Sequence, residues 1–84
     1  MPTVLRVGPY RFLFYASDGG EPRHVHVARD GADAKFWLDP DVSLARNRGY
    51  AARELKTIEK LLASHLQALR DAWDVFFAPP AANH

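Results

Sequence analysis

The chain has 84 residues, 48% of them hydrophobic, with eleven lysines and arginines against ten aspartates and glutamates. Its length indicates one domain, and its hydrophobic fraction is too high for a disordered chain. The lack of cysteine excludes disulfide scaffolds and cysteine-ligated metal centres, and a net charge of +1 means that nucleic-acid binding would need a local basic patch. No apolar run approaches membrane length and residues 1–6 lack the pattern of a secretory leader, so we expect a cytoplasmic protein.

The first hairpin is predicted from residues 3–7 and 10–15, which are rich in Val, Leu, Tyr and Phe. Gly8-Pro9 separates the two segments and is typical of a tight turn. A two-residue turn gives the facing pairs Thr3 with Phe14, Leu5 with Phe12 and Arg6 with Arg11. Because like charges face each other in the last pair, either the register differs or the two arginines share an anionic partner.

A second hairpin is predicted from residues 24–28 and 34–38, which flank the turn dipeptide Asp30-Gly31. Counting outward from this turn pairs Val25 with Phe36 on a core face. The other face holds four polar or aromatic side chains, His24, His26, Lys35 and Trp37. Residues 16–23 are expected to form a loop, Asp39-Pro40 ends the fourth strand, and residues 42–45 are a candidate short fifth strand.

From about residue 50 the hydrophobic period changes to that of a helix. The apolar positions are Leu55, Ile58, Leu62, Leu66, Leu69, Trp73 and Phe76. A helix of about 27 residues would be about 40 Å long, so we expect it to be broken, curved or shared with a partner. The sequence therefore predicts an α+β fold, an antiparallel sheet of four to five strands with the C-terminal helical segment packed on one face. The single domain covers residues 1–78, and residues 79–84 form a disordered tail.

The most informative motif is His24-Val25-His26, because a strand places both imidazoles on one face. Three interpretations stay open: an exposed polar face, an acid–base pair, and a metal site. With Lys35 opposite His26, the two histidines and the lysine are the groups needed to cleave RNA without a metal or other cofactor. A metal site would need a carboxylate, from Glu21 or Asp39, and the lysine beside the imidazoles would oppose a second cation.

Other side chains are candidates for binding nucleic acid or a partner protein. Arginines at positions 6, 11, 46, 48 and 53 are candidate phosphate-binding residues, and Trp37 is a candidate for stacking on a base. The alternatives are a solvated loop with scattered ion pairs for the arginines and a core position for the tryptophan. Trp73, Phe76 and Phe77 exceed what a small sheet covers, so we expect a homodimer or a small protein partner.

The chain resembles a small prokaryotic family that is catalogued as domain of unknown function 4160. The resemblance covers residues 1–77 and is carried by Met1 to Arg6, Gly8 to Phe12, Glu21 to Val27, Ala34 to Leu38, Arg48 to Tyr50, Arg53 to Leu55 and Trp73 to Phe77. It implies a gene encoded beside that of another small protein, an arrangement that has prompted the suggestion of a toxin–antitoxin pair. Relatives tend to have serine where this chain has Ala51, which cannot cap the helix.

Together these features lead us to expect one component of a toxin–antitoxin-like two-gene module that acts on RNA or nucleotides through His24 and His26. The alternatives are a non-catalytic protein- or nucleic-acid-binding module, such as an antitoxin, and a metal-binding domain that uses the histidine pair. The resemblance itself attaches no activity or catalytic residue.

Overall fold

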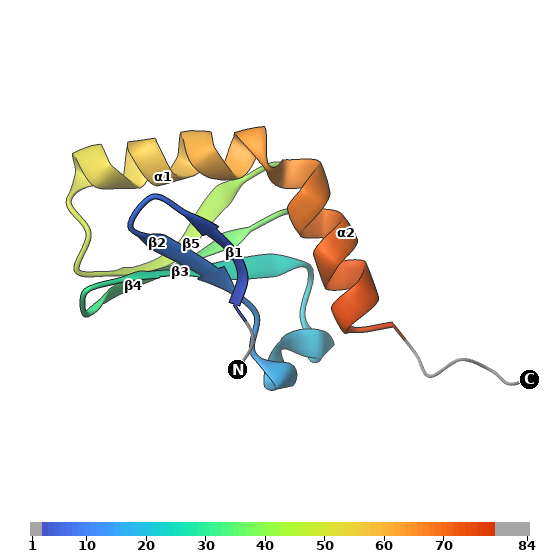
Figure 1. Cartoon of the computed structure of the whole chain (residues 1–84). Coiled ribbons are helices and arrows are strands. Elements are labelled where there is room, and N and C mark those ends of the chain that lie inside the picture. Colours follow the sequence, from blue (N-terminus) through green and yellow to red (C-terminus); the bar gives the residue numbers. More distant parts are fainter. Residues whose placement is uncertain (1–2, 79–84) are drawn as a thin grey trace, which may run out of the picture.

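A computed structural model describes residues 3–78 and shows a five-stranded antiparallel sheet with strand order β1-β2-β3-β4-β5 (Figure 1). The strands are β1 (Thr3–Val7), β2 (Tyr10–Leu13), β3 (His24–Arg29), β4 (Ala32–Trp37) and β5 (Ser43–Arg48). The helices are η1 (Ala16–Gly20), a 3₁₀ helix, α1 (Ala52–Ser64) and α2 (Leu66–Phe76). The predicted α+β fold is therefore confirmed, whereas the predicted tail at 79–84 lies outside the described residues.

The two faces of the sheet are covered differently. Helix α1 runs along one face, α2 descends past the end of the sheet, and η1 lies on the opposite face (Figure 1). Neither α1 nor α2, in the part of the chain that the structure describes, has the length and apolar character of a membrane-spanning helix. Most of the face opposite α1 is left without a covering helix (Figure 1).

The second hairpin has the predicted register. Val25 pairs with Phe36, and His26 pairs with Lys35. Asp30 and Gly31 have φ angles of 46° and 84°, the positive values that a two-residue type I′ turn requires. Because the turn is tight and Val25 and Phe36 are both buried, a shift of one residue would expose this core face.

The first hairpin follows the prediction only near its turn. Leu5 pairs with Phe12 and Arg6 with Arg11, but Thr3 pairs with Leu13, so the predicted pairing of Thr3 with Phe14 is wrong. Between Thr3 and Leu5 the register shifts, which gives β1 one extra residue opposite β2. Such a bulge breaks the simple counting outward from a turn.

Every strand except β1 also differs from its predicted bounds. Strand β2 covers Tyr10–Leu13 in place of 10–15, and β3 covers His24–Arg29 in place of 24–28. Strand β4 covers Ala32–Trp37 in place of 34–38, and β5 covers Ser43–Arg48 in place of 42–45. All six positions of β5 are exposed, so this edge strand has no buried side and its sequence has no alternating pattern to mark its length.

The hydrophobic core lies between the sheet and the helices. It includes the strand residues Phe12, Val25, Val27, Phe36 and Leu38 and the helix residues Ile58, Leu62, Leu69 and Trp73. The helical segment breaks at His65, whose φ of −112° and ψ of 14° end α1 and begin α2. This break lets α2 turn past the end of the sheet and confirms that the segment is not one straight helix.

The start of α1 is fixed by the Glu54 side chain and not by the N-cap residue. Ala51 is the N-cap and makes no side-chain hydrogen bond, as predicted. Glu54 instead accepts hydrogen bonds from the Tyr10 hydroxyl at 2.6 Å and from Arg29 at 2.8 Å. The Arg29 guanidinium and the Tyr10 hydroxyl hold the pKa of Glu54 below its usual value. Glu54 thus connects α1 to β2 through Tyr10 and to β3 through Arg29.

Candidate functional site

The sheet face opposite α1 collects most of the predicted site residues in neighbouring rows. One row across the five strands is Arg6, Arg11, Ala28, Asp33 and Arg48. The next row is Leu13, His26, Lys35 and Arg46, and the third is His24, Trp37 and Ser43. Because paired residues of antiparallel strands point to the same face, the register alone brings these side chains together. We call Arg6, Arg11, Lys35, Arg46 and Arg48 the basic face.

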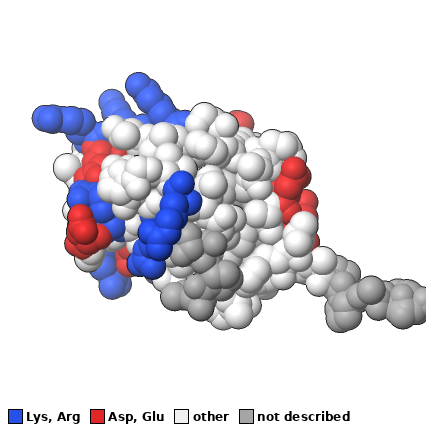
Figure 2. Space-filling model, viewed as in Figure 1, with Lys and Arg blue, Asp and Glu red and all other residues white. Residues whose placement is uncertain are grey.

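Four of these five cations have no anionic partner within residues 3–78. Arg6, Arg11, Arg46 and Arg48 are exposed, and none forms an ion pair with a described residue. Elsewhere in the domain, Arg23, Arg29 and Arg70 each bind a carboxylate. Lysine and arginine side chains gather toward the end of the molecule at which α1 begins (Figure 2).

Lys35 differs from the arginines of the basic face because it is already neutralised. Its Nζ lies 2.6 Å from Glu21 Oε1 and 4.6 Å from the centre of the Trp37 ring. Glu21 therefore neutralises the Lys35 charge, which was expected from the sequence to oppose a cation at the histidines. The Trp37 ring is half-buried and has its edge-to-face neighbour in His24, at 5.5 Å between ring centres.

Arg53 does not join the basic face. It lies on α1, on the opposite side of the sheet, and lines a separate hollow with Tyr10, Glu54 and Thr57. The structure thus brings together four of the five predicted arginines and separates the fifth, which makes Arg53 a natural comparison residue.

A polar hollow of about 270 Å³ opens on the basic face. Its lining includes Arg11, Tyr15, His26, Asp33 and Arg46. Three guanidinium groups, those of Arg11, Arg29 and Arg46, therefore border the same space as one imidazole, together with the carboxylates of Asp30 and Asp33. This combination suits an anion that brings several acceptor oxygens, such as a phosphate group.

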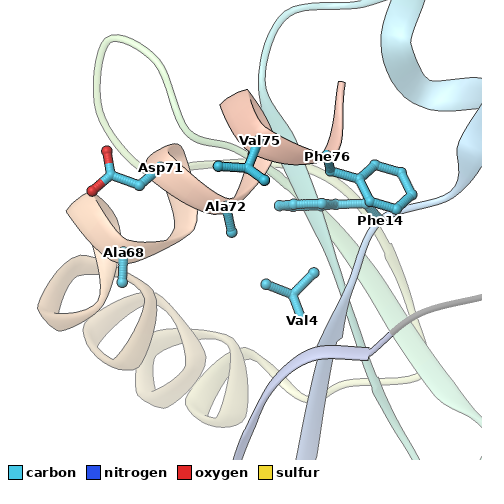
Figure 3. A pocket seen from close by; sticks show the side chains of 7 residues that line it. All are labelled: Val4, Phe14, Ala68, Asp71, Ala72, Val75 and Phe76. Carbon is cyan, nitrogen blue, oxygen red and sulfur yellow. The ribbon is translucent and has the colours of Figure 1, made fainter. Parts of the chain in front are cut away.

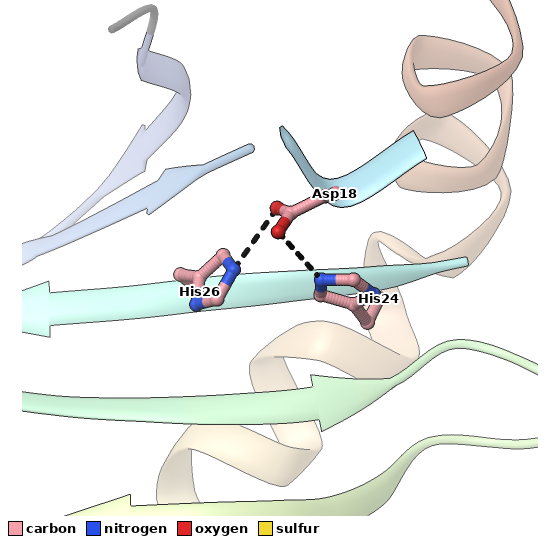
Figure 4. Close-up of side chains that lie close together, drawn as sticks. All are labelled: Asp18, His24 and His26. Carbon is pink, nitrogen blue, oxygen red and sulfur yellow. Dashed lines mark hydrogen bonds and ion pairs between the residues drawn. The ribbon is translucent and has the colours of Figure 1, made fainter. Parts of the chain in front are cut away.

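The two histidines are buried, so the prediction of an exposed polar face is wrong. His24 is 0% exposed and His26 is 9% exposed. The cover comes from η1, which places Asp18 directly over the pair (Figure 4). Asp18 Oδ2 accepts a hydrogen bond from His26 Nε2 at 3.0 Å, and Asp18 Oδ1 lies 3.2 Å from His24 Nε2.

Several contacts fix the position of Asp18. The Tyr15 backbone N–H donates to Asp18 Oδ2 at 2.9 Å, and the Asp18 N–H donates to the Tyr15 carbonyl at 2.9 Å. Gly19 packs against the Phe77 ring so closely that a Cβ there would lie 2.8 Å from a ring carbon. The η1 segment is therefore seated against the end of α2, and a side chain at position 19 would push it away.

The hydrogen bonds of His24 determine which ring nitrogen carries its hydrogen. Nδ1 lies 2.9 Å from the Pro22 carbonyl oxygen, which can only accept, so Nδ1 carries the hydrogen and donates it. In the neutral ring Nε2 then presents a lone pair, and it is a buried polar atom without a hydrogen-bond partner among residues 3–78. This lone pair faces a carboxylate oxygen of Asp18.

Burial and charge shift two pKa values in this cluster. Burial lowers the pKa of His26, an effect that Asp18 opposes without reversing it. Burial by itself would raise the pKa of Asp18, but the Tyr15 amide and the two imidazoles bring it below its usual value. The favoured state is thus an ionised Asp18 with a neutral His26.

The carboxylate of the cluster belongs to Asp18. From the sequence, a carboxylate of Glu21 or Asp39 was predicted there. Glu21 is 51% exposed and binds Lys35, and the nearest nitrogen of His24 is the one that donates to Pro22. Asp39 binds Arg23 and Arg70. The sequence signal that was missed is a carboxylate in the short loop before the histidine motif, which the turn of η1 brings back over β3.

A second, apolar hollow of about 580 Å³ lies beside α2 (Figure 3). Its lining is Val4, Phe14, Ala68, Asp71, Ala72, Val75 and Phe76. Of the aromatic residues predicted to remain uncovered, Trp73 is 6% exposed and packs within the chain, whereas Phe76 is exposed. The apolar surface that remains centres on Val75, which is 78% exposed, and Phe76.

Comparison with known proteins identifies one family. Searches of curated proteins and of solved structures give no match. A family model described as "Domain of unknown function (DUF4160)" matches residues 10–74. This range includes η1, the three residues Asp18, His24 and His26, and Arg11, Arg46 and Arg48 of the basic face. Because the match covers most of the chain, the protein belongs to the DUF4160 family.

Proposed function

We propose that this protein binds single-stranded RNA in the cytoplasm through the basic face. The observation that carries the proposal is the row register, which aligns Arg6, Arg11, Arg46 and Arg48 on the sheet face opposite α1, each without an anionic partner in residues 3–78. Neighbouring strands lie about 4.8 Å apart, so a row across five strands is about 19 Å long. That length accommodates several phosphates of one strand. Trp37 at the side is partly exposed and is the candidate for stacking on a base, in competition with the Lys35 ammonium over its ring.

The geometry favours binding over cleavage by a His24–His26 acid–base pair. An acid or base must come within hydrogen-bond distance of the reacting group, and the fully buried His24 ring lies against Pro22, Asp18, Glu21 and aromatic rings. His26 does border the polar hollow. A toxin-like nuclease therefore becomes the second outcome to look for once RNA is bound, with His26 as the group nearest the substrate.

The test is RNA binding by the double variant Arg11→Ala, Arg46→Ala, measured by fluorescence anisotropy with a labelled uridine oligonucleotide. We expect at least a tenfold weaker affinity near 0.1 M salt, because both guanidinium groups line the same hollow. If each arginine neutralises one phosphate, the slope of log K against log salt falls in magnitude by about 1.4 for two lost contacts on a single strand.

Arg53→Ala is the control for the single variants Arg11→Ala and Arg46→Ala, because it removes one positive charge, as each of them does, from the opposite side of the sheet. Its affinity is expected to stay within about twofold of the original, since exposed charges further apart than a Debye length of about 10 Å are screened. An equal loss from Arg53→Ala would show that overall charge, and not the basic face, determines binding. Unchanged RNA affinity in the double variant would contradict the proposal.

The apolar hollow beside α2 supports a second proposal, that the protein forms a homodimer through this surface. Six of the seven lining residues are apolar. Val75 and Phe76 expose neighbouring apolar side chains, and the removal of such surface from water is favourable. We expect light scattering at micromolar concentration to give twice the mass of one chain, and Val75→Asp to give the mass of one chain. A monomer in both cases would contradict this proposal.

A further inference from the structure

We propose that Asp18, His24 and His26 bind a divalent first-row transition-metal ion of the zinc type. Two imidazoles and one carboxylate are a ligand set that such ions use, with a further coordination position left for water or a substrate. One donor atom can be chosen from each of the three side chains so that all lie within 4.8 Å of one another. The inference stands independently of RNA binding.

The unpartnered nitrogen of His24 is the first reason to place a cation here. The Pro22 carbonyl fixes the hydrogen on Nδ1, so the Nε2 lone pair points at Asp18 Oδ1 from 3.2 Å. Two electron-rich atoms at that distance repel each other unless a proton or a metal ion lies between them. A ligating imidazole usually donates its other N–H to a carbonyl or carboxylate, which orients the ring, and His24 already has this arrangement.

The spacing of the donor atoms is the second reason. Ligands bound at about 2.0–2.1 Å in tetrahedral geometry stand about 3.3 Å apart. Each histidine Nε2 is close to that spacing from one Asp18 oxygen, with His26 3.0 Å from Oδ2 and His24 3.2 Å from Oδ1 (Figure 4). Because these contacts use different oxygens and the three donor atoms lie within 4.8 Å of one another, the side chains must draw slightly closer for one ion to bind all three. For His26 to ligate through Nε2, the hydrogen that it now donates to Asp18 moves to Nδ1 of the same neutral ring, so that step releases no proton.

The local charges also fit a cation. Asp18 supplies a carboxylate whose side chain is only 12% exposed, and the Lys35 ammonium is neutralised by Glu21 at 2.6 Å. The site is also rigid, because Tyr15 holds Asp18 from one side and Trp73 lies against His24, with ring centres 5.1 Å apart. Preformed ligands lose little conformational freedom on binding, which favours affinity.

The test is calorimetric titration of the tag-free full chain with Zn²⁺, and of Asp18→Asn, His26→Gln and two control variants. We expect one ion per chain in the original protein and at least a tenfold weaker affinity in Asp18→Asn and His26→Gln. The controls are Glu59→Gln, which changes an exposed carboxylate on α1, and His65→Gln, which removes a histidine that contacts Ser64 and Leu61 instead. Both controls should bind zinc as the original does, and circular dichroism checks that every variant is folded.

A crystal of the zinc-bound protein provides a readout that does not depend on any variant. We expect an anomalous peak at about 2.0–2.2 Å from Nε2 of both histidines and from an Asp18 oxygen. The proposal is overturned if the original protein binds no zinc, if Asp18→Asn binds it equally well, or if the ion lies elsewhere. It is also overturned if NMR shows both nitrogens of His24 protonated in the presence of excess zinc, because a proton would then occupy the place of the metal.

Discussion

Replacing Leu62 with alanine is expected to lower the free energy of unfolding by about 2–5 kcal/mol, the range for truncating a buried leucine. Leu62 is 0% exposed and lies in the core between α1 and the sheet. A typical domain is stable by about 5–15 kcal/mol, so this single change removes a large part of the stability. Urea denaturation followed by circular dichroism measures the loss.

Leu44→Ala is the matched control for this experiment, because Leu44 on β5 is 43% exposed. An exposed truncation is expected to change stability by no more than about 0.5 kcal/mol. If the Leu62 variant lost as little as the Leu44 variant, α1 would not be packed on the sheet as described.

Replacing Trp73 with alanine is expected to lower the free energy of unfolding by about 3–5 kcal/mol, the range for a buried aromatic residue. The Trp73 ring lies 5.2 Å from Phe14, 5.1 Å from His24 and 4.2 Å from Phe77, measured between ring centres. It therefore fixes α2 to the sheet and also forms part of the cover over His24. The same urea experiment measures this loss.

Trp73→Phe serves as the comparison, because it keeps an aromatic ring in the cavity and should cost less than alanine. The Trp73→Ala variant should also lose order around His24, which NMR of the imidazole groups would report. A loss below about 1 kcal/mol, within the ordinary range for a point mutation, would mean that α2 is not held at the end of the sheet by this residue.

The parts of the fold that depend on local chemistry were predictable. Asp30-Gly31 fixes both the turn and the register, because positive φ angles are needed there and the strands on either side alternate. The helical period from Leu55 to Phe76 was equally clear, although the position of the break at His65 was not. No glycine or proline marks that break, but the Ser64 hydroxyl donates to the Leu61 carbonyl at 2.9 Å and His65 Nδ1 lies 2.9 Å from the same oxygen. Side chains that bond to a helix carbonyl in this way compete with the helix and bend it.

The parts that depend on contacts between distant residues were not predictable. The bulge between Thr3 and Leu5 has no marker in the sequence. Strand β5 is an exposed edge that is held by hydrogen bonds to β4 and not by a hydrophobic face. Both features depend on the neighbouring strand, which a single-sequence pattern does not contain.

The candidate site was also predictable where it depends on local chemistry and not where it depends on contacts between distant residues. The strand period alone placed His24 and His26 on one face, and the Asp30-Gly31 turn placed Lys35 opposite His26. Arg46 was not predicted to join this row, because the predicted fifth strand ended at residue 45. Asp18 was missed because its position depends on η1 packing against Phe77, a contact between residues far apart in the chain. The burial of the histidines has the same origin, since the sequence predicted a loop where η1 covers them.

The most direct test of RNA binding by the basic face is a map of backbone amide shifts when unlabelled uridine oligonucleotide is added to ¹⁵N-labelled protein. The proposal predicts that the largest shifts fall on the outward-facing rows, at Arg11, Ala28 and Arg46, and that the amides of α1 around Arg53 barely move. Shifts that are confined to α1 and α2, or no shifts at all near 0.1 M salt, would contradict it.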